Sequence, residues 1–195
     1  MRVRELNGWD HIELQCLPAE LHNRPERIPG AVLEKISEQR ERFAGVFVAY
    51  ADCGTGGLLD KALAGTGIQR IPGAHCYEFF AGGETFHALA DEEPGSFYLT
   101  DFLVRHFERL VVRGLGLDRN PQLLPTYFGN YRRVVHLAQT NDAELAALAR
   151  EHTHFLGLDY HYHFCGDGPL ALALKPLVNR GVRVKGQSND SVPLL

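Results

Sequence analysis

The sequence predicts an α/β protein with an open, mainly parallel sheet and helices on both faces. Short apolar runs alternate with segments of helical periodicity along most of the chain, which is typical of strand–helix–strand crossover units. The 195 residues, 45% of them hydrophobic, are enough for one sizeable core. Several apolar runs also end at cysteines, glycines or acids, as strands often do where their loops form a binding crevice.

The elements follow in order along the chain. The opening "MRVRELNGWD" has the pattern of a helix end that leads into the first strand. We expect strands at residues 11–16, 45–50, 68–73, 96–100, 132–139 and 158–164. We expect helices over about 29–43, from 57 onward, and over 84–93, 101–110 and 142–154. Asp101 and Asp142 are predicted helix caps, because a carboxylate accepts hydrogen bonds from the free N–H groups of a first turn.

The domain organisation follows from the same pattern. We expect a single α/β domain over residues 1–178. The last residues, 179–195, show no periodicity and contain several turn formers, so we expect an irregular C-terminal tail.

Charge and hydropathy exclude some classes of partner. The formal net charge is −4 and basic residues are dispersed among acids, so we expect no nucleic-acid partner. No apolar stretch approaches the roughly 20 residues of a membrane span, and no signal peptide is evident. We therefore expect a cytoplasmic protein without membrane association.

Three of the four cysteines follow predicted strands. Cys16, Cys53 and Cys76 come after the first, second and third strands, and the carboxyl ends of parallel strands meet at one edge of a sheet. In a reducing compartment these thiols are candidate metal ligands rather than disulfide partners. His22 and His75 are candidate additional ligands. The alternative is simple burial, which is common for free cysteine.

The segment "YHYHFC" offers a second possible metal site. Strand alternation would place His161, His163 and Cys165 on one face, and such a face could bind zinc or nickel. The alternative is an edge strand of the sheet with one polar face.

The loop "DCGTGG" is a candidate cofactor site. It partly resembles the glycine-rich motif of methyltransferases that use S-adenosylmethionine, with Asp52 at the place of a glycine and Tyr50 at the place of an acid. Glu78 could then bind the ribose. A phosphate cradle and a purely structural turn are the alternatives. The residues that would bind the cofactor are Asp52, Gly54, Thr55, Gly56 and Gly57. No residue receives a catalytic role.

Five segments carry a resemblance to a known family. They are "GWDHIELQCLPAELHNRPERIP", "VFVAYADCGTGGLLDKAL", "RIPGAHCYEFFAG", "PGSFYLTDFLVRHFERLVVRGLGLDRNPQL" and "YFGNYRRVVHLAQT". The sequence thereby resembles the family called domain of unknown function 1638 over about residues 8–160. The resemblance implies a bacterial or archaeal protein, often encoded near corrinoid proteins and corrinoid-dependent methyltransferases. Family members begin with a further strand and a Cys-Gly loop, so we expect the first family strand to be missing here.

The leading functional hypothesis combines the cysteines with this resemblance. We expect Cys16, Cys53 and Cys76 to hold a metal, in first place an iron–sulfur cluster, in an accessory or redox protein of corrinoid-dependent methyl transfer and one-carbon metabolism. The expected partner is a corrinoid protein or a methyltransferase. One alternative is an S-adenosylmethionine-type methyltransferase that uses the "DCGTGG" loop. Another is a non-catalytic binding module for a corrinoid protein.

Overall fold

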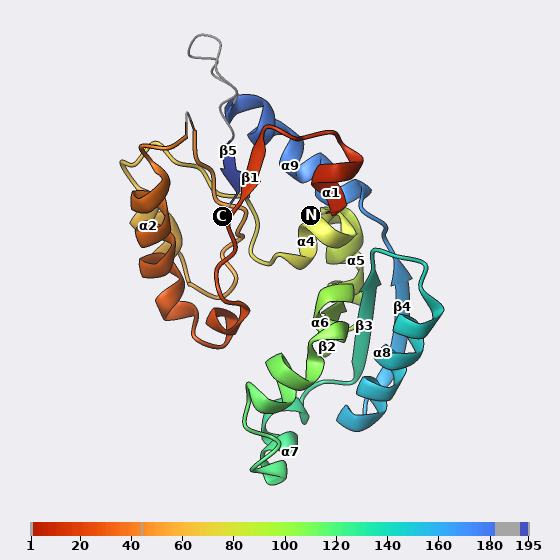
Figure 1. Cartoon of the computed structure of the whole chain (residues 1–195). Helices are drawn as coiled ribbons and strands as arrows, with labels where there is room; N and C mark the ends of the chain where they lie inside the picture. The colour runs from red at the N-terminus through yellow and green to blue at the C-terminus, as the bar shows by residue number, and fades with distance from the viewer. Residues whose placement is uncertain (1, 44, 182–191, 195) are drawn as a thin grey trace. The chain divides into compact units, whose positions relative to one another are not determined.

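The computed structural model describes residues 2–43, 45–181 and 192–194 (Figure 1). The chain divides into two compact units. Unit 1 comprises Met1–Cys76 and Leu170–Leu195, and unit 2 comprises Tyr77–Pro169. The single domain over residues 1–178 stays a prediction. Among the helices of the described residues, none combines the length and apolar character that a membrane span requires.

Unit 2 contains the predicted parallel sheet. Its strands are β2 (Ser96–Thr100), β3 (Arg133–Ala138) and β4 (Asp159–Phe164), in the order β2-β3-β4. Both strand pairs are parallel, as the alternation of strand and helix patterns predicts. The open α/β fold expected from the sequence is therefore confirmed.

Helices cover both faces of this sheet. Leu99 and Val134 pack with Val104 of α6 (Asp101–Arg105) and Ala149 of α8 (Ala143–Leu156). The neighbouring positions point to the opposite face, where Tyr98 and Val135 pack against two other helices. These helices are α4 (Tyr77–Ala81) and α5 (Gly83–Glu92). Figure 1 shows α8 alongside β3 and β4.

The first turns of two helices separate a correct cap prediction from a wrong one. Asp142 is the N-cap of α8 and accepts a hydrogen bond from the Leu145 N–H at 3.0 Å. Asp101, in contrast, is the first residue of α6, and Thr100 caps that helix. The prediction for Asp101 is wrong because its carboxylate bonds to groups at the end of the next strand instead. The chain continues from α6 through the π-helical turn Glu108–Arg113, a 3-10 turn at Pro121–Leu123 and α7 (Leu124–Phe128).

Unit 1 is built from shorter elements. They are α1 (Arg2–Leu6), β1 (Ile12–Leu14), 3-10 turns at Ala19–Asn23 and Pro25–Arg27, α2 (Ile28–Gln39), α3 (Leu58–Leu63) and β5 (Val192–Leu194). β1 and β5 pair in parallel. Ile28, Val32 and Ile36 lie on one face of α2 and pack with Val48 and Leu59 into a buried cluster, as helical periodicity predicts.

The two strands expected at residues 45–50 and 68–73 are reduced to one parallel bridge. Val48 pairs with Arg70, and the Val48 N–H and C=O bond to Gln69 and Ile71. Pro72 has no N–H to extend a ladder, and Gly73 turns the chain with φ +115°. The parallel direction is still enough to bring the two following loops together.

The last helix is α9 (Gly168–Gly181). It extends past residue 178, where we expected the irregular tail to begin. Within that predicted tail, residues 182–191 lie outside the described residues, and 192–194 form β5.

Candidate metal centre

Three side chains of unit 1 form a compact group of possible metal ligands. His22 lies in the 3-10 turn Ala19–Asn23, Cys53 in the loop before α3, and Cys76 at the end of the loop that follows the Val48–Arg70 bridge. One ligand atom from each of the three lies within 4.8 Å of the others. In the part of the chain that the structure describes, this is the one such group of three or more histidine, cysteine or acidic residues.

Backbone hydrogen bonds hold the two cysteine loops side by side. The Asp52 N–H donates to the Gly73 carbonyl at 3.1 Å, and the Cys53 N–H donates to the Ala74 carbonyl at 2.9 Å. Cys53 has φ +48°, a left-handed conformation that is uncommon for a residue other than glycine. The sulfur atoms of Cys53 and Cys76 lie 2.6 Å apart.

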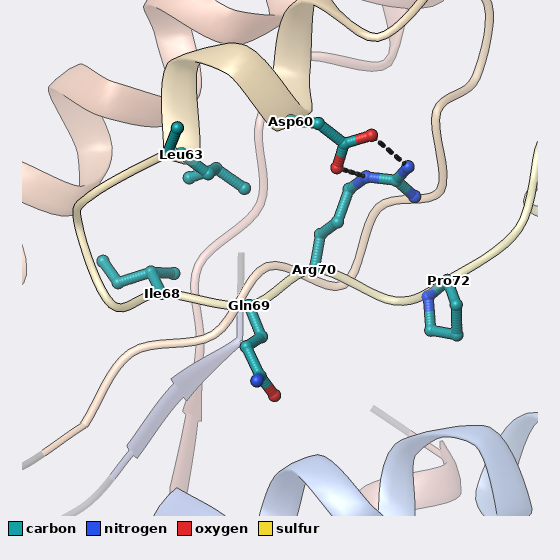
Figure 2. Close-up of a pocket in the computed structure, with 7 residues that line it drawn as sticks. Asp60, Leu63, Ile68, Gln69, Arg70 and Pro72 are labelled. Atoms are coloured by element: carbon teal, nitrogen blue, oxygen red, sulfur yellow. Dashed lines mark hydrogen bonds and ion pairs between the residues drawn. The ribbon is translucent and has the colours of Figure 1, made fainter.

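Arg70 supports the loop that leads to Cys76. Its Nε and Nη2 donate to the two carboxylate oxygens of Asp60 at 2.6 and 2.7 Å, and Figure 2 shows this pair beside a shallow hollow between α3 and residues 68–72. Arg70 Nη1 also donates to the Gly73 carbonyl at 3.2 Å. Because that carbonyl also accepts from Asp52, the ion pair braces both cysteine loops. Sequence patterns gave no sign of this role, since it depends on how α3 turns back.

Ring stacking and a backbone carbonyl hold the His22 ring. Its ring stacks on Tyr50, with ring centroids 5.4 Å apart and an interplanar angle of 21°. Its Nδ1 lies 3.3 Å from the Ala19 carbonyl. A carbonyl only accepts, so Nδ1 carries a proton, and in the neutral ring Nε2 keeps a lone pair. A backbone carbonyl on the second ring nitrogen is the usual support of a histidine ligand.

The two thiols share their protons unequally. A hydrogen bond from Cys76 lowers the pKa of Cys53 to about 5, although burial opposes this and His22 assists it. The pKa of Cys76 is raised, because its S–H bonds to Cys53 and because it is buried. The hydrogen bond to Cys53 also raises the pKa of His22, against the effect of burial. Without a metal, the pair at neutral pH is one thiolate and one thiol.

The pKa of Tyr50 reflects its burial and its position near the cysteines. Burial raises its pKa to about 12, and the charges of Cys76, Cys53 and Cys16 add to the effect in that order. Sequence patterns predicted no role for Tyr50 in metal binding. The structure places it against His22 and within electrostatic range of three cysteines.

The donor set fits a thiophilic ion. Two thiolates and one imidazole match the Cys₂His ligand set of zinc sites that keep an open fourth position. With zinc–sulfur bonds of about 2.3 Å in tetrahedral geometry, the two sulfurs would lie about 3.8 Å apart. They are 2.6 Å apart here, so binding would move them about 1 Å further apart. His22 is exposed, which leaves this side of the site open to solvent.

The other predicted ligands lie outside this group. Cys16 and His75 are both exposed, and neither belongs to the group of three. The structure therefore brings together Cys53, Cys76 and His22, and does not bring Cys16 or His75 into the same cluster. A three-cysteine site stays a prediction.

Hydrogen bonds within the glycine-rich loop are made to the carboxylate of Asp52. The Asp52 carboxylate accepts hydrogen bonds from the N–H groups of Gly56 and Gly57, both at 2.9 Å, and from the Thr55 hydroxyl. These bonds lower the pKa of Asp52, the one from Thr55 most. Gly54, Gly56 and Gly57 have φ +84°, +60° and +82°, so the loop conformation itself calls for glycine.

This arrangement bears on the expected cofactor site. A phosphate or an S-adenosylmethionine carboxylate would have to compete with Asp52 for the N–H groups of Gly56 and Gly57. Glu78, the expected ribose ligand, lies in α4 of unit 2. Cofactor binding by Asp52, Gly54, Thr55, Gly56 and Gly57 stays a prediction.

The histidine-rich segment forms β4, an edge strand of the described sheet. His161 and His163 are half-buried on one face, and Tyr162 and Phe164 are exposed on the other. The described part of this strand contributes to no group of three possible metal ligands. The edge-strand interpretation is therefore confirmed.

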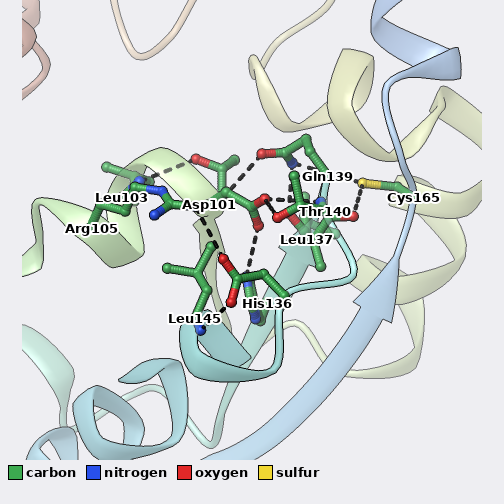
Figure 3. A network of polar contacts seen from close by, with 12 residues as sticks. Asp101, Leu103, Arg105, His136, Leu137, Gln139, Thr140, Leu145 and Cys165 are labelled. Atoms are coloured by element: carbon green, nitrogen blue, oxygen red, sulfur yellow. Dashed lines mark hydrogen bonds and ion pairs between the residues drawn. The ribbon is translucent and has the colours of Figure 1, made fainter. Parts of the chain in front are cut away.

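A second polar cluster, missed by the sequence analysis, lies at the carboxyl ends of the strands in unit 2 (Figure 3). Asp101 follows β2, Gln139 and Thr140 follow β3, and Cys165 follows β4. Asp101 accepts hydrogen bonds from Thr140 and pairs with His136 Nε2 at 3.1 Å. Gln139 accepts from the Asp101 N–H and donates to Cys165. Asp101 directly after an apolar strand was the signal that could have indicated this cluster.

Comparison with known proteins tests the family resemblance. A search of curated proteins and a search of solved structures found no match. The profile of the family described as protein of unknown function (DUF1638) matches residues 16–170. That range includes the Cys53, Cys76 and His22 group and all of unit 2. Because the match covers most of the 195 residues, the chain belongs to the DUF1638 family.

Proposed function

We propose that this protein binds one thiophilic metal ion, in first place zinc, through Cys53, Cys76 and His22. The observation that carries this proposal is the convergence of these three donors, from three separate segments, to within 4.8 Å of one another. The contact of His22 Nδ1 with the Ala19 carbonyl also supports it, because a backbone carbonyl on one ring nitrogen is a usual partner of a histidine ligand.

Charge balance also favours a metal at this position. Two thiolates side by side repel each other, and the pair therefore retains a proton on Cys76 when no cation is present. A divalent ion would replace that proton and make the ion with its two thiolates neutral overall. A single ion suits the group better than the iron–sulfur cluster expected from the sequence, because such clusters usually take four cysteines. Cys16 is the cysteine that could add a thiolate.

The wider role rests on the family resemblance. We propose an accessory or redox protein of corrinoid-dependent methyl transfer and one-carbon metabolism, with a corrinoid protein or a methyltransferase as partner. Three protein ligands leave the fourth coordination position of the ion open for an exogenous ligand. The ion can then act on that ligand as a Lewis acid. Reduced thiolate ligands also suit the cytoplasm. The bonds of Asp52 to Gly56 and Gly57 make the S-adenosylmethionine alternative less well supported.

Metal analysis of anaerobically purified protein tests the proposal. We expect about one zinc ion per chain in the parent, as in other sites of this ligand set. Cys53→Ser, Cys76→Ser and His22→Ala should each lose most of it. Cys165→Ser is the matched control, since that thiol bonds to the Ala138 carbonyl in unit 2, and it should retain the metal.

Substitution by cobalt gives a second readout. Cobalt(II) should show thiolate charge-transfer absorption that is lost in Cys53→Ser and unchanged in Cys165→Ser. A parent protein that takes up neither zinc nor cobalt, or a Cys53→Ser variant that holds as much metal as the parent, would contradict the proposed function.

A further inference from the structure

The spacing of the two sulfur atoms in the metal site points to a second state of that site. The Sγ atoms of Cys53 and Cys76 are 2.6 Å apart, and both cysteines are free thiols. A disulfide bond is about 2.05 Å long, whereas two thiolates on one tetrahedral zinc ion lie about 3.8 Å apart. The spacing of the metal-free pair lies between these two values, so the two sulfurs are within reach of both states.

The surrounding backbone keeps the pair together in the absence of metal. The bonds from Asp52 N–H to the Gly73 carbonyl and from Cys53 N–H to the Ala74 carbonyl join the two loops directly at the cysteines. Arg70 holds the Gly73 carbonyl from the other side. These contacts involve no metal ligand atom. Once one of two thiols held in this way carries a mixed disulfide, the other attacks it far faster than a thiol on a flexible segment would.

The pair is also accessible to a small reagent. His22, beside Cys53, is exposed, and so are Gly54 and Gly56 in the same loop. A Cβ atom built at Gly56 would meet no other atom within 4 Å. Cys53 and Cys76 are themselves half-buried, so part of the pair faces solvent.

We propose that Cys53 and Cys76 form a reversible disulfide by exchange with a low-molecular-weight disulfide, and that this disulfide and the bound metal exclude each other. The second part rests on the proposed function. One pair of sulfurs cannot serve both states, because a disulfide sulfur has lost the thiolate charge that binds the ion. The metal site would thereby respond to the thiol–disulfide balance of its surroundings.

The exchange is balanced in two steps. The Cys53 thiolate attacks one sulfur of the reagent R–S–S–R, so that a Cys53–S–S–R bond forms and R–S⁻ leaves. The Cys76 sulfur then attacks the Cys53 sulfur, the protein disulfide forms, and a second R–S⁻ leaves; in the metal-free form the Cys76 proton passes to the R–S⁻ released in the first step. The two cysteine sulfurs lose two electrons, the reagent gains them, and the divalent ion dissociates without a change in oxidation state.

The test uses the full chain with only this pair of cysteines. Cys16→Ser and Cys165→Ser are combined, because Cys16 is exposed and would react on its own. The zinc-loaded and the metal-free forms are each treated with oxidised glutathione. Released zinc is measured with a chromogenic chelator, and the intact mass and peptide map report the disulfide.

We expect both forms to lose two hydrogen atoms and to show the Cys53–Cys76 linkage without a glutathione adduct. The zinc-loaded form should also release about one ion per chain, and a reductant should restore binding. In the same background, Cys76→Ser should instead retain one glutathione on Cys53, because no second thiol displaces it.

The outcomes separate this inference from the proposed function. Zinc that stays bound while both thiols remain free overturns the inference and leaves the proposed function intact. If the parent binds no zinc, the proposed function fails, and the metal-free form still tests the disulfide. A Cys53–Cys76 linkage in that form supports the proposed disulfide. A stable glutathione adduct on the two-cysteine form overturns it.

Discussion

Replacing Asp101 by alanine should destabilise unit 2 by several kcal/mol. Asp101 is 7% exposed and His136 is 1% exposed. The Asp101 carboxylate pairs with His136 Nε2 at 3.1 Å and accepts from the Thr140 N–H at 2.9 Å and the Thr140 hydroxyl at 2.6 Å. The Asp101→Ala change removes the acceptor of all three bonds at once.

The size of the destabilisation depends on whether each hydrogen-bond donor can reach water once the Asp101 carboxylate is gone. His136 cannot reach water, and a stranded buried donor costs about 1–3 kcal/mol. Thr140 is half-buried, so each of its two bonds to the charged acceptor contributes about 1 kcal/mol. Relief from burying the charge of Asp101 returns about 1 kcal/mol. The net loss is about 2–4 kcal/mol, a large part of the roughly 5–15 kcal/mol that stabilises a typical domain.

Hydrogen exchange and urea unfolding measure this loss. Amides of β3 should exchange faster in Asp101→Ala by the factor that corresponds to the lost free energy, because β3 carries His136 and leads to Thr140. Asp118→Ala is the control, since Asp118 is an exposed acid of the same unit and should change stability by less than about 0.5 kcal/mol. Exchange of the β3 amides in Asp101→Ala that matches this control would refute the reasoning.

The same carboxylate predicts a pH dependence. Burial raises the pKa of Asp101, but the hydrogen bonds from His136, Thr140 and Gln139 outweigh it, so the pKa lies below its ordinary value. A lowered pKa in the folded state adds stability that is fully present above the ordinary carboxyl pKa of about 4 and is lost as the pH falls through the folded value. Asp101→Asn should therefore lose less stability than the parent on acidification below about pH 4. Equal acid dependence of the two would contradict this.

Three further predictions concern unit 1. Gly30 lies in the first turn of α2, and a new Cβ there would meet no atom within 4 Å, so Gly30→Ala should raise the free energy of unfolding by about 0.5–1 kcal/mol. Gly57 has φ +82°, so Gly57→Ala should lower it by about 1 kcal/mol. Urea unfolding that shows the same sign for both variants would contradict this. In reduced, metal-free protein, the rate of Cys53 alkylation by iodoacetamide should rise with pH around a midpoint near the Cys53 pKa of about 5. Cys76→Ala should move that midpoint to higher pH, because it removes the hydrogen bond that lowers this pKa most. An unchanged midpoint would count against the Cys53–Cys76 hydrogen bond. Leu59→Ala, at a side chain that is 0% exposed, should cost about 2–5 kcal/mol by urea unfolding, and a loss below about 1 kcal/mol would show that the cluster around α2 and α3 is not tightly packed.

Part of the metal site could be inferred from the sequence by a general rule about strand ends. Cys53 and Cys76 follow two apolar segments that run in parallel, and the structure brings their sulfurs together. The rule held although the two segments form only one bridge, because direction rather than ladder length places the loops. It did not select the third donor. The third member of the group is His22, whose ring is held by a 3-10 turn and by stacking on Tyr50. Cys16 and His75 do not belong to the group.

Elements with local sequence signals could be predicted before the structure was known. The strands of unit 2, helix α8 and its Asp142 cap all follow from periodicity and capping chemistry within a few residues. Which polar groups come into contact depends instead on how the chain packs. Asp101 pairs with His136 instead of capping a helix, and the Cys53 N–H donates to the Ala74 carbonyl of another loop. Such choices depend on which donors lie within about 3 Å after packing, and a distance of that kind between separate segments has no counterpart in a local pattern of residues.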